Sequence, residues 1–292
     1  MKGWSYISNH PQQSMGNPDI VAITNEVWEE INQYCNLNDV ILDVQYDDGT
    51  IGDRPILAYA SRTLFLEDGV WRSGALNSQG HLGSIRIRIN PSVPNGWYVD
   101  DGTCQTGYRY DLRTVLRHEI AHGIGVSSSV TPSSVGYYYG TECYPTMFDT
   151  LMKDESDKNI VTACSHSHSV GDKAYVDSVQ LYNPNLFNQG SSYSHTHDSG
   201  LMYYAIYPME CHDFDANTFQ LLNAIGANCT IPNVDPITDE APPLPALGTA
   251  PSPDTFNEPS PAPAPYELSS AGSCITPFSM LYILMLVVLK WL

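Results

Sequence analysis

The stretch LRHEIAHGIGVSSSVTPSS, residues 116–134, has two histidines four positions apart and a glutamate directly after the first. On an α-helix, residues i and i+4 share a face, so His118 and His122 can present two imidazoles to one metal ion. Glu119 lies beside them, where a carboxylate can take a proton from water as that water attacks a carbonyl. The pattern predicts a zinc-binding helix with Glu119 as general base.

The third metal ligand does not follow the helix directly. Gly125 allows the chain to turn sharply after His122. Ser128 then stands where the commonest form of this motif has its third ligand, and serine binds zinc poorly. Glu142 has the spacing of a glutamate ligand carried by a second helix, but the Ser-, Gly- and Tyr-rich run before it does not predict such a helix.

Two histidine-rich stretches remain as sources of this ligand: Cys164–His168, which contains His166 and His168, and Tyr193–His197. We favour His195 in the second stretch, because it follows a serine and leaves a longer connection to Met202. Met202 is expected in a tight turn beneath the ion. His197 stays as the alternative, His166 and His168 are expected in a solvated loop, and His212 at the surface or supporting a ligand.

With its long insertion, its late histidine and the Leu-Met pair, the chain resembles leishmanolysin-like metzincins, a family of zinc metallopeptidases. It is also similar to secreted bacterial proteins with the same order of features. The stretches NGWYVDDGT, MFDTLMKD and ECHDFDANTFQLLNAIG extend the likeness over residues 43–229. The interval from His195 to Met202 is shorter than in the family, and no pro-segment or switch cysteine is recognisable, which leaves latency unexplained.

The resemblance implies a zincin/metzincin-like catalytic domain with a twisted mixed sheet, an active-site helix and an irregular C-terminal subdomain that ends in a helix. It also implies one catalytic Zn²⁺ held by His118, His122 and His195, with Glu119 as base. Met202 would be the methionine of the turn, and Tyr204 would stabilise the transition state.

Hydrophobic periodicity and capping residues independently predict an α+β fold. Helices are expected over 19–35, over 110–125 with Asp111 as N-cap and Gly123 or Gly125 as terminator, and over 213–226 between Asp215 and Gly226. Strands are expected over 39–47, 54–65 and 83–91. The last alternates isoleucine with arginine and ends at Pro91, which suggests a position near a sheet edge, where it could pair with a substrate.

Composition points to an exported protein that does not bind nucleic acid. The 13 Lys+Arg and 32 Asp+Glu residues give a net charge of -19, which disfavours nucleic acid and anionic membrane surfaces as partners. Six of the seven cysteines lie in residues 18–230 and predict up to three disulfides. A glycosylation sequon begins at Asn228. These features predict an extracellular or cell-surface location.

The chain divides into four parts. Residues 1–17 are expected to be poorly ordered, 18–230 to form the metallopeptidase domain, 231–273 a Pro-, Ala- and Ser-rich acidic stalk, and 274–292 a hydrophobic tail. Small residues at 269–273 precede the tail as in a lipid-anchor signal, and a membrane segment is the alternative. The first residues lack the apolar core of a signal peptide, so we expect the recorded start to be incomplete.

The predicted function is that of a monomeric zinc endopeptidase that acts on proteins or peptides and contacts a membrane only through its tail. The alternative is a non-catalytic cell-surface binding or adhesion module on the same fold. A structural zinc protein is a third interpretation, which would require a fourth protein ligand such as Glu142.

Overall fold

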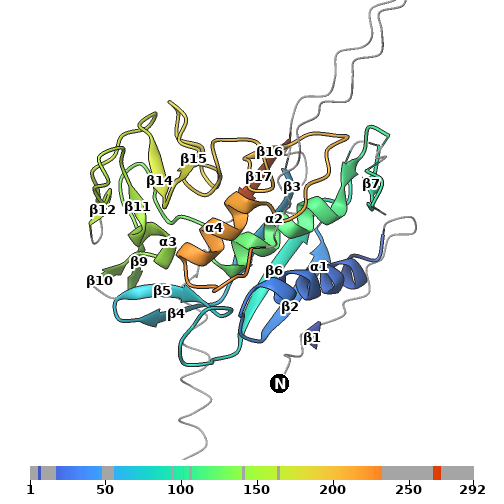
Figure 1. Cartoon of the computed structure of the whole chain (residues 1–292), viewed down its shortest axis with the longest axis horizontal. Coiled ribbons are helices and arrows are strands. Elements are labelled where there is room, and N and C mark those ends of the chain that lie inside the picture. Colours follow the sequence, from blue (N-terminus) through green and yellow to red (C-terminus); the bar gives the residue numbers. More distant parts are fainter. Residues whose placement is uncertain are drawn as a thin grey trace, which may run out of the picture.

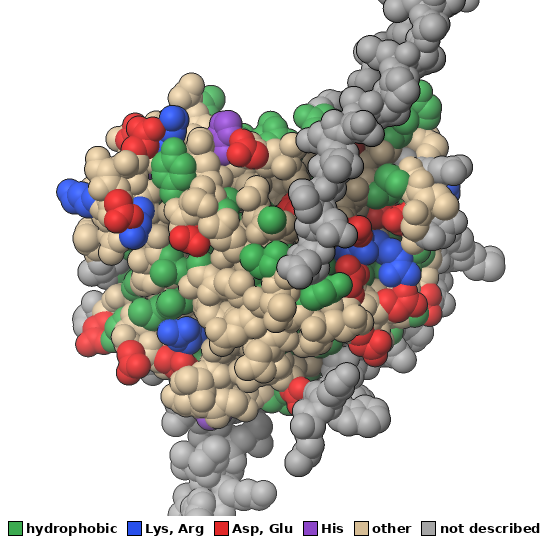
Figure 2. Space-filling view, viewed as in Figure 1, with side chains coloured by type: hydrophobic (Ala, Val, Ile, Leu, Met, Phe, Trp, Pro, Cys, Tyr) green, Lys and Arg blue, Asp and Glu red, His purple; other side chains and the backbone are tan. Residues whose placement is uncertain are grey.

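The computed structural model describes residues 6–7, 18–47, 56–93, 95–100, 102–104, 107–139, 142–162, 165–231 and 266–270. These residues form a mixed α+β fold around one central six-stranded sheet (Figure 1). On the face seen in Figure 2, acidic and basic side chains lie scattered among other residues and form no continuous basic surface.

The central sheet has the order β1-β2-β6-β3-β17-β16 and contains both parallel and antiparallel pairs. β2 runs parallel to β6, β6 antiparallel to β3, β3 parallel to β17, and β17 antiparallel to β16. Its strands are β1 (Tyr6–Ile7), β2 (Val40–Tyr46), β3 (Ile56–Arg62), β6 (Gly83–Ile89), β16 (Ala205–Ile206) and β17 (Tyr266–Ser270).

The prediction that residues 83–91 lie near a sheet edge is wrong. β6 pairs along its length with β2 on one side and over Ile85–Ile89 with β3 on the other. The alternation of isoleucine and arginine correctly marks one buried and one wetter face, since Ile85, Ile87 and Ile89 are buried. Side-chain alternation reports burial above and below a sheet and carries no information about neighbours within its plane.

Two long helices, α1 (Ile20–Tyr34) and α2 (Leu112–Ile124), pack against this sheet and confirm two predicted helices (Figure 1). Asp19 caps α1 by accepting hydrogen bonds from the N–H groups of Val21 and Ala22. The guanidinium of Arg117 on α2 donates to Glu30 on α1, at 3.1 Å. This ion pair fixes α2 against its neighbour.

Glycines set how closely α2 approaches the sheet and where it ends. A Cβ at Gly123 would lie 2.3 Å from Cγ2 of Ile85, so only glycine lets α2 sit this close to β6. Gly125 is the C-cap, with φ +148°, and its N–H donates to the carbonyl of Ala121. Asp111 caps the other end through the N–H of Thr114, as predicted.

The remainder of the described chain consists of short strands, two helices and turns. The final helix, α4, is capped by Asp215 as predicted and packs against α2. The other elements are β4 (Leu64–Glu67), β5 (Val70–Ser73), β7 (Trp97–Tyr98), β8 (Tyr110–Asp111), β9 (Tyr137–Tyr139), β10 (Glu142–Tyr144), α3 (Met147–Thr150), β11 (Met152–Lys153), β12 (Val161–Thr162), β13 (Ser165–His166), β14 (Ala174–Val176), β15 (Val179–Leu181) and α4 (Ala216–Ala224).

Two disulfides, Cys35–Cys229 and Cys104–Cys211, tie together distant parts of the chain. They favour an oxidising, extracellular compartment. Cys164, needed for a third bond within the predicted domain, lies outside the described residues. So does the hydrophobic tail at 274–292. Among the helices in the described ranges, none is both long and apolar enough to cross a membrane.

One predicted strand differs from the structure, and two short strands lie within segments predicted without regular structure. The single strand expected over 54–65 is divided at Thr63 into β3 and β4. Within the predicted stalk, Tyr266–Ser270 forms β17 inside the central sheet. Within the predicted poorly ordered start, Tyr6–Ile7 pairs with β2. The rest of 1–17 and 232–273 lies outside the described residues.

Candidate metal centre

Three histidines from two separate parts of the chain meet at one point. The Nε2 atoms of His118 and His122, one helical turn apart on α2, lie 2.9 Å from each other. The Nε2 atom of His195 lies 3.1 Å from that of His118 and 3.3 Å from that of His122. All three side chains are fully buried, and among the described residues they form the one cluster suited to holding a metal ion.

The outer nitrogen of each imidazole faces a backbone carbonyl. Nδ1 of His118 lies 2.7 Å from the carbonyl oxygen of Leu201, Nδ1 of His122 2.5 Å from that of Val126, and Nδ1 of His195 3.0 Å from that of Ser191. Since a carbonyl only accepts, each Nδ1 carries the proton and donates it. This tautomer leaves the lone pair of every Nε2 directed inward.

The imidazole nitrogens of these three histidines are suitable donor atoms for a metal ion. Three inward lone pairs within 3.3 Å repel one another unless a cation lies between them. Burial lowers the pKa of His195 to about 4, and burial together with the neighbouring imidazoles lowers the pKa of His118 and His122 well below 6.5. The histidines are therefore neutral at pH 7, the state in which imidazole binds a metal.

Glu119 is the second unusual group at this centre. Its side chain is fully buried, and neither carboxylate oxygen has a hydrogen-bond partner among the described residues. Burial raises the pKa of this carboxyl well above 4.5. A buried carboxyl without a hydrogen-bond partner is costly to maintain, which makes Glu119 a candidate functional residue.

Met202 lies in a tight turn. The N–H of Tyr203 donates to the carbonyl of Gly200 and closes this turn, and the Met202 side chain is buried. The residue before it supplies the carbonyl that orients His118. The turn is held to the His195 segment by the N–H of Thr196, which donates to the carbonyl of Met202 at 2.8 Å. The turn and the third histidine therefore form one hydrogen-bonded unit.

The His195 segment is positioned by pairing with β15 and the residue that follows it. The N–H of Tyr182 donates to the carbonyl of His195 at 2.8 Å, and the N–H of His197 donates to the carbonyl of Gln180 at 2.9 Å. Within this segment the His195 side chain is fully buried, whereas the His197 side chain is 57% exposed and pairs with Asp198.

Other residues considered as ligands lie elsewhere. Glu142 is exposed on β10 and does not belong to the three-histidine cluster. His166 is half-buried and lies 3.0 Å from the carbonyl of Thr131 through Nε2. His168 lies 3.3 Å from the hydroxyl of Tyr193. His212 lies 3.5 Å from Glu210. These histidines support loops around the centre.

Tyr204 stacks on Tyr182, with ring centroids 4.0 Å apart, and also interacts with Tyr203. Burial and a hydrogen bond with Tyr204 raise the pKa of Tyr203 to about 12. The ring of Tyr204 thus belongs to an aromatic group beside the turn. Its predicted role in the transition state remains a prediction.

Asp149 was not singled out in the sequence, although it organises the loop after α2. Its buried carboxylate accepts hydrogen bonds from the hydroxyl of Ser128 at 2.7 Å, from the N–H of Ser129 at 3.0 Å and from the hydroxyl of Thr146 at 2.7 Å. Ser128 thus anchors the loop. The signal was available as Thr146 followed three residues later by an acid, the capping-box pattern.

Arg62, at the end of β3, was also missed. Its guanidinium donates to the carbonyl of His122 at 2.9 Å, and the hydroxyl of Ser73 donates to the carbonyl of Ile124. Both groups satisfy carbonyls at the C-terminal end of α2 that have no partner within the helix. Side-chain to backbone contacts of this kind leave no periodic pattern in a sequence.

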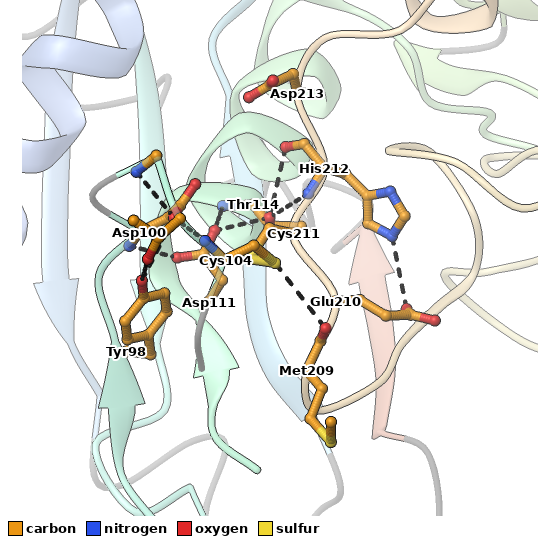
Figure 3. The surroundings of a disulfide bond; sticks show 12 residues. Tyr98, Asp100, Cys104, Asp111, Thr114, Met209, Glu210, Cys211, His212 and Asp213 are labelled. Atoms are coloured by element: carbon orange, nitrogen blue, oxygen red, sulfur yellow. Dashed lines mark hydrogen bonds and ion pairs between the residues drawn. A yellow bond between two sulfur atoms is a disulfide. The ribbon is translucent and has the colours of Figure 1, made fainter. Parts of the chain in front are cut away.

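The Cys104–Cys211 disulfide joins the loop before α2 to the segment that precedes α4, close to the helix start (Figure 3). The hydroxyl of Thr114 and the backbone of His212 form hydrogen bonds beside it, including a 2.7 Å bond from the N–H of His212. This crosslink holds the N-terminal end of α2, while Arg62 and Ser73 hold its other end.

Comparisons of the chain with protein-family models, with curated proteins and with solved structures find no match. The likeness to leishmanolysin-like metzincins accordingly rests on the sequence motifs, and the chemistry of the centre rests on its own geometry.

Proposed function

We propose that this protein is a zinc-dependent endopeptidase with a metzincin-type catalytic domain that acts outside the cell on proteins or peptides. The observation that carries the proposal is the convergence of three inward-facing imidazoles next to a buried carboxyl without a hydrogen-bond partner among the described residues. Three neutral imidazoles suit zinc, and three protein ligands leave one position for water or substrate, as in catalytic sites.

His118, His122 and His195 would hold the ion. A zinc ion bound there would polarise a scissile carbonyl and make a water molecule acidic. Three protein ligands, without a fourth protein donor in the described cluster, argue for a catalytic rather than a structural site. The carbonyls of Leu201, Val126 and Ser191 keep the imidazoles in the required tautomer and raise their basicity as ligands.

Glu119 carries the proton in this proposal. Its carboxylate takes a proton from the attacking water and gives it to the nitrogen of the leaving amine. Burial raises the pKa of this carboxyl, which makes its carboxylate form a stronger base. The absence of competing hydrogen bonds to either oxygen among the described residues leaves both free for this transfer. Tyr204 would contribute by stabilising the charge that develops on the substrate oxygen.

The decisive experiment compares the zinc-loaded full chain with Glu119→Gln on an unfolded protein substrate, with and without a chelator. We expect Glu119→Gln to keep zinc and lose hydrolysis by about 10²-fold or more. The matched control is Glu142→Gln, which changes an exposed carboxyl away from the cluster and should leave both readouts unchanged. Equal hydrolysis by the wild type and Glu119→Gln, or no chelator-sensitive hydrolysis by either, would overturn the proposal and favour a binding module.

A further inference from the structure

The central sheet contains a slot one strand wide between β3 and β16. β17 fills it: Glu267, Ser269 and Ser270 pair in parallel with Ile56, Tyr59 and Ala60 of β3. On its other side, Tyr266 and Glu267 pair antiparallel with Ile206 and Ala205 of β16. Figure 1 shows the three strands side by side next to α2. Because neighbouring strands lie about 4.8 Å apart, the strands that flank β17 are roughly 10 Å apart.

Both walls of the slot are tied directly to the metal centre. β3 ends at Arg62, whose guanidinium donates to the carbonyl of His122 at 2.9 Å. β16 begins three residues after Met202, within the segment whose Leu201 carbonyl faces His118 at 2.7 Å. A peptide held between these two strands is therefore held beside the histidine cluster.

The direction of β17 determines which of its ends lies nearer to the histidine cluster. It runs parallel to β3, so Ser270, paired with Ala60, lies at the end of β3 that leads to Arg62. It runs antiparallel to β16, so the same end of β17 also lies toward Met202, which precedes Ala205. The C-terminal end of β17 is consequently the end nearer to the metal centre on both sides.

We propose that the slot between β3 and β16 is the peptide-binding site of this enzyme, and that Tyr266–Ser270 occupies it as an intramolecular inhibitor. The inference rests on the proposed function. A strand paired on both sides is bound through its backbone, so any extended peptide of suitable shape can replace it. An unfilled slot would expose two strand edges, and the chain covers them with its own residues.

This arrangement would restrain hydrolysis within the folded chain. Residues 231–265 connect β17 to the rest of the same chain, and a segment connected in this way competes at an effective concentration on the order of millimolar. A free substrate at micromolar concentration then competes poorly. Release follows when β17 leaves the slot or when the connection at residues 231–265 is cut.

The test uses proline in the full chain, because proline lacks the N–H group that a paired strand donates. Ser269→Pro/Ser270→Pro should weaken the pairing of β17, whereas the control Ser269→Ala/Ser270→Ala keeps both N–H groups. Hydrogen–deuterium exchange is followed in β3 (Ile56–Arg62) and, as an internal reference, in β2 (Val40–Tyr46). Hydrolysis of an unfolded protein by the zinc-loaded chain is measured in parallel.

We expect faster exchange in β3 with unchanged exchange in β2, unaltered zinc content, and a rise in hydrolysis of roughly ten-fold or more in the proline variant alone. A synthetic peptide spanning residues 264–272, added in trans, should restore protection of β3 and suppress hydrolysis. A second chain, carrying a specific protease site between residues 240 and 250, should show the same changes once it is cut.

The outcomes separate the two proposals. If β3 exchange is unchanged in both the proline and the cut chains, β17 does not occupy the slot and the inference is overturned. Faster β3 exchange with no rise in hydrolysis, while the wild type hydrolyses protein, overturns the inhibitory role. Faster β3 exchange in a protein that never hydrolyses substrate supports the strand-binding slot and overturns the proposed peptidase.

Discussion

The Nε2 atom of His195 lies 3.1 Å from the Nε2 atom of His118, although the two residues are 77 positions apart in the chain. The contact is produced by the pairing of the His195 segment with residues 180–182 and by the turn at Gly200–Tyr203, which together bring a loop residue onto the face of α2. The geometry places His195, and not the exposed His197, with the helix histidines.

Replacement of His195 and His197 by alanine should therefore have unequal effects. Loss of His195 removes one of three candidate ligands, and we expect zinc affinity to fall by about 100-fold or more. His197→Ala is the matched control and should keep the affinity, because its ring pairs with Asp198 at the surface. Titration with a competing chelator measures both. Equal loss in the two variants would contradict the assignment.

Stability of the metal-free protein should fall as the pH drops below 6.5. Burial lowers the folded-state pKa of His195 to about 4 and those of His118 and His122 well below 6.5. Between the folded-state pKa values and the unfolded-state value of about 6.5, the unfolded chain binds protons that the folded chain does not. Each histidine then removes about 1.4 kcal/mol of unfolding free energy per pH unit.

Glu119 affects the unfolding free energy in the opposite direction. Because its pKa is raised in the folded state, the folded chain holds a proton that the unfolded chain has lost, and this stabilisation disappears as the pH rises through the folded-state pKa. The Glu119→Gln variant should therefore lose stability more steeply than the wild type between pH 6.5 and 4.5. Urea denaturation of the metal-free proteins over this range measures both slopes. A flat profile would show that the three imidazoles are not buried in the neutral state.

Asp149→Asn should destabilise the loop that follows α2. The buried carboxylate accepts from Ser128, Ser129 and Thr146, and an amide cannot accept all of these hydrogen bonds. We expect a loss of about 2–4 kcal/mol, because several charge-assisted hydrogen bonds are weakened together. The control is Asp157→Asn, where the side chain is 84% exposed and pairs only with Lys153 in the described structure. Chemical denaturation that ranks the two variants equally would contradict the role of Asp149.

Gly123→Ala should disturb the contact between α2 and the sheet. The added Cβ would lie 2.3 Å from Cγ2 of Ile85, and overpacking of this kind costs about 1–3 kcal/mol. Combining it with Ile85→Ala removes the clashing methyl group, so the double variant should lose less stability than the sum of the two single variants. Strict additivity in a double-mutant cycle would show that this contact does not limit the helix position.

Local features of the fold were predictable because they depend on residues adjacent in the sequence. Asp19 and Asp111 lie directly before the helices that they cap, and the apolar spacing of α1 matches its buried face. The order of strands in the sheet was not predictable in this way. The alternating residues of β6 are the same whether a strand is central or at an edge, and the pairing of β17 depends on backbone groups that every residue has.

The residues of the candidate centre likewise fall into those that the sequence predicts and those that it does not. His118, Glu119 and His122 could be predicted from helical geometry, since residues four positions apart on a helix share one face. His195 could be favoured only through the serine before it and the longer connection to Met202, because the long insertion between the helix and the loop has no period. Asp149 and Arg62 act through backbone groups and hydroxyls of residues far from them in sequence, and composition alone does not reveal such contacts.

The measurement that tests the central claim most directly is a crystal structure of the zinc-loaded Glu119→Gln variant. Our account predicts one ion bonded to the Nε2 atoms of His118, His122 and His195, each at about 2.0–2.1 Å, with a non-protein ligand in the remaining position. An ion bound elsewhere, a fourth protein side chain on the ion, or His195 outside bonding distance would contradict it.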